Sequence, residues 1–164
     1  MNRKIFEWNV ELFNNNLAAR YFLQFIYGVM PLVMFVAYPA LIVYVFFQWR
    51  DELLRFILVP LCVFIGVTVL RVIINEQRPY ERYGKPSVFK KETKGKSFPS
   101  RHTASAFIIA MAFMRVSIPL GTAAMTVALL IELSRILAGA HYIHDVVAGM
   151  AISVIAGYIF FFLI

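Results

Sequence analysis

Charged residues are scarce in this chain. Only 15% of its 164 residues are Asp, Glu, Lys or Arg, whereas 61% are hydrophobic. Soluble globular domains usually carry about 25% charged residues, so the composition excludes an ordinary soluble domain. A bilayer is the solvent that accommodates this much apolar side chain. Because the length suits one domain, we expect residues 1–164 to form a single membrane-embedded domain.

Cysteine and acidic residues are also rare. The lone Cys62 excludes an intrachain disulfide, and its apolar surroundings indicate a packing role. The net charge of +7 would suggest nucleic acid in a soluble protein, but no nucleic-acid motif is present. The basic residues gather at the N-terminus and from Arg71 to Arg101, beside apolar runs. This distribution suits membrane lipid head groups or a phosphate substrate, and not nucleic acid.

The first twenty residues lack the continuous apolar core of a signal peptide. Ile5, Trp8 and Leu12 recur at helical spacing among polar residues. This pattern predicts an amphipathic helix within residues 1–20 that lies in the membrane interface and is anchored by Trp8. A mobile tail is the alternative.

Apolar runs predict the rest of the fold. Spanning a bilayer takes about 20 apolar residues, and the candidate spans are residues 21–47, 53–74, 100–114, 120–137 and 143–164. The sequence therefore predicts an all-α, polytopic transmembrane helix bundle of about five spans. The third run is short and rich in Ala and Ser, so it should pack closely inside the bundle.

The one long polar segment, residues 75–98, has no helical periodicity and must lie outside the hydrocarbon. If the spans alternate in direction, this segment meets the start of the third span, the end of the fourth and the start of the fifth at one membrane face. We expect a polar active-site loop there.

Arginines at that face are the first candidate site residues. Arg71 and Arg135 each end an apolar run, and ionisable residues in spans are functional candidates. Arg78 follows Arg71 by seven residues, close to two helical turns, so both are expected to point the same way. Gathered guanidiniums repel one another unless an anion lies between them, and arginine suits a tetrahedral oxyanion. Alternatively, these arginines snorkel or pair with Glu76 and Glu132.

A helix start with a histidine comes next. Ser100 follows Pro99 and is a suitable N-cap for the third span. The free backbone N–H groups of a helix start bind anions, and His102 in the first turn is placed to donate a proton. The alternative is a plain cap beside a surface histidine.

The third candidate is a histidine with an acidic partner. If the fifth span starts by His141, then Asp145 stands one turn later on the same helical face. Asp145 would hold one ring nitrogen and leave the other as a nucleophile. His144 lacks such a partner and is interpreted as a secondary, head-group contact.

These residues together resemble the type 2 phosphatidic acid phosphatase superfamily, which includes bacterial lipid phosphatases, glucose-6-phosphatase and vanadium haloperoxidases. The family pattern is Lys, six residues, Arg-Pro; then Pro-Ser-Gly-His; then Ser-Arg, five residues, His, three residues, Asp. The same spacings run from Arg71 to Asp145 in this chain.

The resemblance implies a role for each matching residue. His141 would attack phosphorus and become phosphorylated, Asp145 would orient it, and His102 would protonate the leaving group. The implied phosphate-binding residues are Arg71, Arg78, Ser100, Arg101 and Arg135. Fixed donors of this kind stabilise transition-state charge. No metal or other cofactor is implied.

Two residues depart from the family pattern. Arg71 stands where the family has Lys, which keeps the charge but changes the donor geometry. Arg101 stands where it has Gly. One hypothesis is that Arg101 contacts a second phosphate of a diphosphate substrate, and the alternative is that it points into solvent or head groups. Many members also have six spans, and the N-terminal helix is expected to stand in for the missing one.

The expected function is a lipid phosphatase of the bacterial inner membrane. Candidate substrates are phosphatidylglycerol phosphate, phosphatidic acid, undecaprenyl diphosphate and lipid A phosphates. A phosphotransferase using the same histidine, an anion carrier or an accessory membrane protein are the alternatives. Counting Lys and Arg would put the site in the cytoplasm, whereas the resemblance implies a site facing the periplasm or the cell exterior.

Overall fold

The computed structural model describes residues 1–91 and 93–164; position 92, within the expected loop 75–98, lies outside the described residues. The described chain is helical. Its elements are α1 (Arg3–Asn15), α2 (Leu17–Gln48), the 3₁₀ turn η1 (Arg50–Glu52), α3 (Leu53–Ile74), α4 (Pro79–Tyr83), α5 (Arg101–Val116), α6 (Ile118–Leu137), α7 (Ile143–Tyr158) and the π-helical η2 (Ile159–Leu163).

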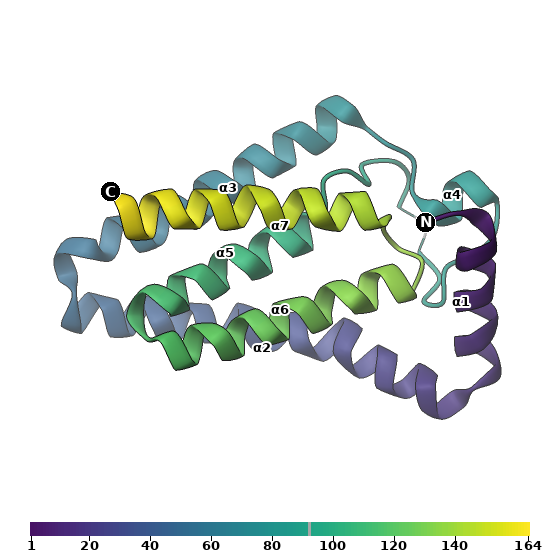
Figure 1. Ribbon diagram of the computed structural model, residues 1–164, viewed down its shortest axis with the longest axis horizontal. Coiled ribbons are helices and arrows are strands. Elements are labelled where there is room, and N and C mark those ends of the chain that lie inside the picture. The colour runs from purple at the N-terminus through teal and green to yellow at the C-terminus, as the bar shows by residue number, and fades with distance from the viewer. Residues whose placement is uncertain (92) are drawn as a thin grey trace.

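The long helices form a bundle with two distinct ends (Figure 1). The α2–α3 and α5–α6 turns lie at one end, together with the C-terminus. The N-terminus, α4 and the loop after it lie at the other end. The predicted all-α bundle is confirmed, and the predicted run 53–74 coincides with α3.

Within residues 1–91 and 93–164, four helical stretches are long and apolar enough to cross a membrane, and they contain α2, α3, α6 and α7. The remaining predicted span, α5, has only 16 residues, or about 24 Å of helix at 1.5 Å per residue. It lies inside the bundle, where α3, α6 and α7 all pack against it. Many of its residues are buried and small, among them Ala104, Ala106, Ala110 and Ala112. The expectation of a short, closely packed third helix is therefore confirmed.

Small residues let α7 approach α5 closely. Gly149, Ser153 and Gly157 recur every four residues along α7 and are all buried, a pattern that favours close contact between membrane helices. The Ser153 hydroxyl donates a hydrogen bond to the main-chain oxygen of Ala104 at 2.7 Å. A Cβ added at Gly149 would come within 2.6 Å of the carbonyl oxygen of Ser100. The start of α5 is thus seated directly on α7.

Prolines inside the helices leave main-chain carbonyls without their helical donors. Pro60 of α3 has no N–H, so the carbonyl of Phe56, four residues earlier, loses its i to i−4 bond. The Tyr38 hydroxyl of α2 donates to that carbonyl instead. A neighbouring helix therefore satisfies a polar group that hydrocarbon could not solvate. Pro31 in α2 likewise leaves the carbonyl four residues earlier without its helical donor.

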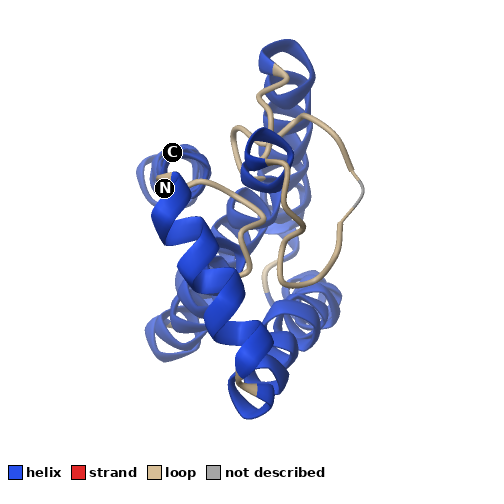
Figure 2. Cartoon of the chain, turned by 90° about the vertical axis from the view of Figure 1, so that its right-hand side faces the viewer, coloured by secondary structure: helices blue, strands red, loops and turns tan. Residues whose placement is uncertain are grey.

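The N-terminal helix lies across one end of the bundle (Figures 1 and 2). Ile5, Trp8 and Leu12 are exposed, whereas Phe6 is buried and contacts the turn at Gly139. An apolar exposed stripe on a helix crosswise to the spans is the arrangement of an interfacial helix. The predicted amphipathic helix is confirmed.

Close packing at Gly149 gives a stability prediction. Gly149→Ala should destabilise the protein by about 1–3 kcal/mol, the usual range for overpacking, because its new methyl group meets the Ser100 carbonyl oxygen. Gly66→Ala is the matched control, because no atom lies within 4 Å of its added Cβ, and it should stabilise α3 by up to about 1 kcal/mol. Thermal unfolding in detergent micelles measures both, and equal melting temperatures for the two variants would contradict the seating of α5 on α7.

Candidate active site

The structure brings the predicted site residues together at the bundle end where α1 and α4 lie. They come from the last turn of α3, the N-cap of α4, the start of α5, the last turn of α6, the turn before α7 and the first turn of α7. In chain order they are Arg71, Arg78, Ser100, Arg101, His102, Arg135, His141 and Asp145.

The His141–Asp145 pair is buried and hydrogen-bonded. Nδ1 of His141 lies 3.1 Å from Oδ2 of Asp145, and the side chains are 1% and 0% exposed. Oδ2 also accepts a bond from the Tyr142 N–H at 2.9 Å and one from the Ser97 hydroxyl. A carboxylate held at Nδ1 favours the tautomer with its proton there. Nε2 then keeps the lone pair that a nucleophile needs.

The condition for a shared helical face, a fifth span that starts by His141, is not met. α7 begins at Ile143, so His141 lies in the turn before the helix and not on its face. The turn is made by Gly139, which has φ +72°, and Asp145 caps the helix by accepting the Tyr142 N–H. The pair meets because the carboxylate reaches back over the helix start.

Arg78 faces the other nitrogen of His141. Its Nη1 lies 3.4 Å from Nε2 of His141 and 3.3 Å from the Ala140 carbonyl oxygen. Its Nε donates to the Gly95 carbonyl oxygen at 3.2 Å. The guanidinium therefore lies within reach of the oxygens of a phosphoryl group attached to Nε2.

Arg71 and Arg78 do not share a helix, which corrects the prediction drawn from their spacing. α3 ends at Ile74, and Asn75 adopts a left-handed conformation with φ 46°. Arg78 is the N-cap of α4. Arg71 instead donates to the Pro99 carbonyl oxygen at 2.9 Å, immediately before α5.

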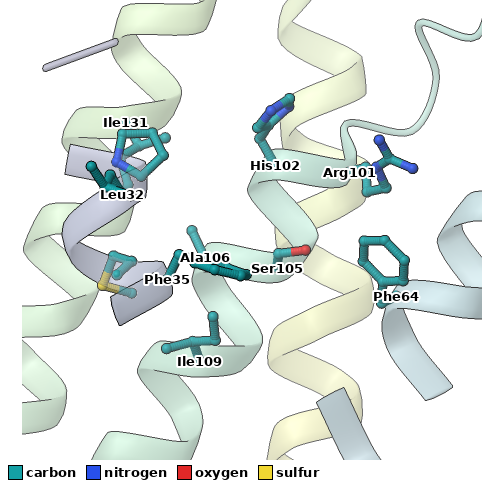
Figure 3. Close-up of a pocket in the computed structure, with 11 residues that line it drawn as sticks. Leu32, Phe35, Phe64, Arg101, His102, Ser105, Ala106, Ile109 and Ile131 are labelled. Carbon is teal, nitrogen blue, oxygen red and sulfur yellow. The ribbon is translucent and has the colours of Figure 1, made fainter. Parts of the chain in front are cut away.

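The start of α5 has the predicted cap. Ser100 is fully buried, accepts a bond from the Thr103 N–H at 3.4 Å, and donates its own N–H to the Asp145 carbonyl oxygen at 2.9 Å. His102 in the first turn is exposed. The half-buried Arg101 lies beside the Phe64 ring of α3, with Cζ 5.2 Å from the ring centroid. His102 and Arg101 point in different directions from α5 (Figure 3).

Arg135 is held by α2. Its Cζ lies 3.8 Å from the centroid of the Tyr27 ring, and Nη2 donates to the Tyr27 carbonyl oxygen at 3.0 Å. The side chain is 4% exposed. Nζ of Lys91 lies 5.1 Å from the same ring centroid.

Three buried arginines have no acidic partner among the described residues. Over residues 1–91 and 93–164, Arg71, Arg78 and Arg135 form no ion pair within 4 Å. Glu76 contacts a histidine and Glu132 accepts from a threonine, so the alternative of arginine–glutamate pairing is not realised. Buried charges without partners are costly. Within the described residues, the three guanidiniums therefore keep their positive charge without a neutralising carboxylate.

Among the described residues, three side chains that could bind a metal ion lie close together. Glu76, His144 and Asp145 each offer one ligand atom, and these atoms lie within 4.8 Å of one another. Nε2 of His144 lies 3.1 Å from Oε1 of Glu76 and 3.1 Å from Oδ1 of Asp145. The His144 ring lies between two carboxylates. His144 thus faces two acids, a contact that was not predicted.

Ser97, Glu81 and Tyr27 were missed by sequence reasoning. Ser97 donates to the carboxylate that orients His141, and Glu81 accepts from the Gly95 N–H at 2.8 Å, which holds the loop in place. Both lie in or beside an aperiodic polar segment, and Tyr27 lies in an apolar run. No periodic pattern or motif distinguishes them.

An apolar cavity opens beside the start of α5. Its volume is about 490 Å³, and Arg101 and His102 line it together with apolar residues of α2, α3, α5 and α6 (Figure 3). A second cavity of about 660 Å³, lined by α2, α3 and α5, shares Phe35, Phe64, Ser105 and Ile109 with the first. The shared residues place the two mostly apolar cavities next to each other, and His102 lines the first of them.

Comparisons with known proteins agree with this geometry. A family model described as "PAP2 superfamily" matches residues 52–164. The crystal structure of LpxE from Aquifex aeolicus is similar, with 26% identity, a TM-score of 0.70, and coverage of 92% of this chain and 90% of that one. A PAP2 type phosphatidylglycerolphosphate phosphatase from Bacillus subtilis shares the fold, with 17% identity, a TM-score of 0.61, and coverage of 96% and 85%. A search of curated proteins gave no match.

The surroundings of His141 predict its titration. Burial, aided by the Arg78 charge, lowers the pKa of His141 from 6.5 to about 4, against the opposing effect of the Asp145 hydrogen bond. The ring should therefore be neutral at pH 7 and take up a proton only as the pH falls towards about 4. Nitrogen-15 NMR of labelled histidines in micelles measures this. Arg78→Gln should raise the pKa of His141, because a neighbouring positive charge is removed, and a wild-type pKa at or above 6.5 would contradict the assignment.

Proposed function

Because the chain belongs to the PAP2 superfamily, we propose that it is an integral membrane phosphatase that hydrolyses the phosphomonoester or diphosphate of a lipid through a phosphohistidine. One observation carries the proposal. A histidine nitrogen, Nε2 of His141, faces the Arg78 guanidinium at 3.4 Å, while a buried carboxylate holds the opposite nitrogen at 3.1 Å.

The first step forms a bond between Nε2 of His141 and phosphorus, and it breaks the bond from phosphorus to the lipid oxygen. Asp145 stabilises the positive charge that develops on the ring. Arg78, Arg71 and Arg135 supply hydrogen bonds to the phosphoryl oxygens, and the backbone N–H groups at the start of α5 add to them. These groups provide the positive charge that a metal ion supplies in other phosphatases.

Protons move through His102 in this proposal. His102 gives a proton to the departing lipid alkoxide, and the neutral ring then accepts one from the attacking water. Water forms a new bond to phosphorus, the bond to Nε2 breaks, and inorganic phosphate leaves. His102 is exposed at the start of α5 and lines the cavity. Both observations support this role, because the lipid part of the substrate, which becomes the leaving group, would lie in that cavity.

The apolar cavity supports a lipid as substrate. A phosphate seated near His102 has the two adjacent, mostly apolar cavities beside it, and acyl or prenyl chains match such a lining. Phosphatidylglycerol phosphate, phosphatidic acid, undecaprenyl diphosphate and lipid A phosphates all have this form. Arg101 stands at the cavity wall beside Phe64, within the region where a second phosphate of a diphosphate would lie.

Metal-free catalysis by His141 is tested with protein purified in detergent and assayed with EDTA present. The wild type should release phosphate from at least one lipid phosphate or diphosphate, and His141→Ala should lose at least about a thousandfold, the scale of losing a catalytic nucleophile. His144→Ala, in the first turn of α7, is the matched control and should lose less than about tenfold. Acid-labile phosphate trapped on the wild type but not on His141→Ala would identify the intermediate.

Other outcomes discriminate between functions. No release from any lipid, or equal activity in His141→Ala, would contradict the hydrolase. Transfer of the phosphate to an added alcohol in preference to water would indicate a phosphotransferase. Movement of phosphate across vesicles with esters left intact would indicate a carrier.

We further propose that the site faces the periplasm or the outside of a bacterial inner membrane. The N-terminus lies at the site end of the bundle and the C-terminus at the opposite end (Figure 1), so the C-terminus would be cytoplasmic. Lys94 is exposed in the loop beside the site. A Lys94→Cys variant, made with Cys62→Ala to remove the natural thiol, should react with an impermeant maleimide in intact cells. Reaction only after permeabilisation would place the site in the cytoplasm.

A further inference from the structure

Helix α2 contributes to the site although it precedes the residues that the family model matches, 52–164. Its contribution is Tyr27, which contacts Arg135 of α6 with both its ring and its main chain. Both residues lie near the site end of their helices.

The main-chain contact follows from the sequence. Pro31 stands four residues after Tyr27 inside α2 and has no N–H, so the Tyr27 carbonyl has no helical donor. Within an apolar run such a carbonyl needs a donor from a neighbouring helix. Nη2 of Arg135 supplies it at 3.0 Å.

The ring contact restrains the same guanidinium. Cζ of Arg135 lies 3.8 Å from the Tyr27 ring centroid, a close cation–π distance. Phe89 packs against the Tyr27 ring in turn, with the two ring centroids 4.9 Å apart. A ring and a carbonyl on one residue together fix both the position and the plane of the guanidinium.

Arg135 keeps donors for a ligand after these contacts are made. Its Nε is buried, and within the described part of the chain it has no hydrogen-bond partner. A carbonyl orients the guanidinium without cancelling its charge, whereas a carboxylate would have neutralised it. The remaining N–H groups are therefore preorganised for an anion.

We propose that Tyr27 is a positioning residue, which uses its ring and the carbonyl released by Pro31 to hold Arg135 ready for a phosphoryl group. This inference rests on the phosphate-binding role proposed for Arg135. It assigns part of the phosphate site to α2, a helix that carries none of the family motif.

Binding of inorganic phosphate to the detergent-solubilised protein tests the inference without requiring turnover. Isothermal titration or phosphorus-31 NMR gives the dissociation constant. Arg135→Ala should weaken binding by about tenfold or more, as expected for loss of a charge-assisted bond. Tyr27→Leu should weaken it by about threefold to thirtyfold, the range of a cation–π contact.

Conservative variants separate positioning from general damage. Tyr27→Phe keeps the ring and the carbonyl, so its affinity should stay within about twofold of the wild type. Pro31→Ala gives the Tyr27 carbonyl a helical donor that competes with Arg135, so affinity should fall. Pro39→Ala is the matched control in the same helix and should bind phosphate like the wild type.

A double-mutant cycle decides the outcome. In an Arg135→Ala background, Tyr27→Leu should cause no further loss, because its effect passes through the guanidinium. An equal loss in both backgrounds, or none in either, overturns the inference. Unchanged binding in Arg135→Ala also overturns it but leaves catalysis by His141 standing. If the cycle shows coupling between Tyr27 and Arg135 but no lipid releases phosphate, the inference is supported and the proposed hydrolase function is contradicted.

Discussion

The site depends on arginines that are held by main-chain carbonyls instead of carboxylates. Arg71 donates to Pro99, Arg78 to Gly95 and Ala140, and the guanidinium on α6 to a carbonyl of α2. A carboxylate partner would fix such a side chain and would also neutralise its positive charge. A carbonyl dipole fixes it and leaves most of its charge for a ligand, so in the proposed function the cost of burying these cations is recovered when the phosphate binds.

Free carbonyls exist only where regular helix hydrogen bonding stops. Gly95 and Gly139 have positive φ values of 61° and 72° and shape the loops that present the carbonyls facing Arg78. Within α2 a proline does the same without ending the helix. The irregular backbone at this end of the bundle is therefore part of the proposed phosphate site. It is tolerated at membrane depth because these freed acceptors meet charged donors.

Sequence patterns predicted the helices and much of the site, but not how the site is held. Hydropathy located α3 from Leu53 to Ile74, because an uninterrupted apolar run has few other solutions in a bilayer. The motif spacing brought His141 to Asp145 but implied a shared helix face, whereas the turn at Gly139 places the histidine before α7. Every residue carries a carbonyl, so a carbonyl that binds arginine has no sequence signature. Pro31 is the exception, because a proline inside a helix shows that the carbonyl four residues earlier has no helical donor.

The shortness of α5 sets the depth of the chemistry. An upright helix of 16 residues rises about 24 Å, less than a hydrocarbon core of about 30 Å. The α5–α6 turn lies at the end opposite the site (Figure 1), so the first turn of α5 stops short of the other surface. In the function proposed above, His102 is recessed below the head groups, beside the cavities lined by α2, α3 and α5. We propose that at that depth a lipid phosphate reaches the arginines by moving sideways along the membrane, without its chains leaving the hydrocarbon.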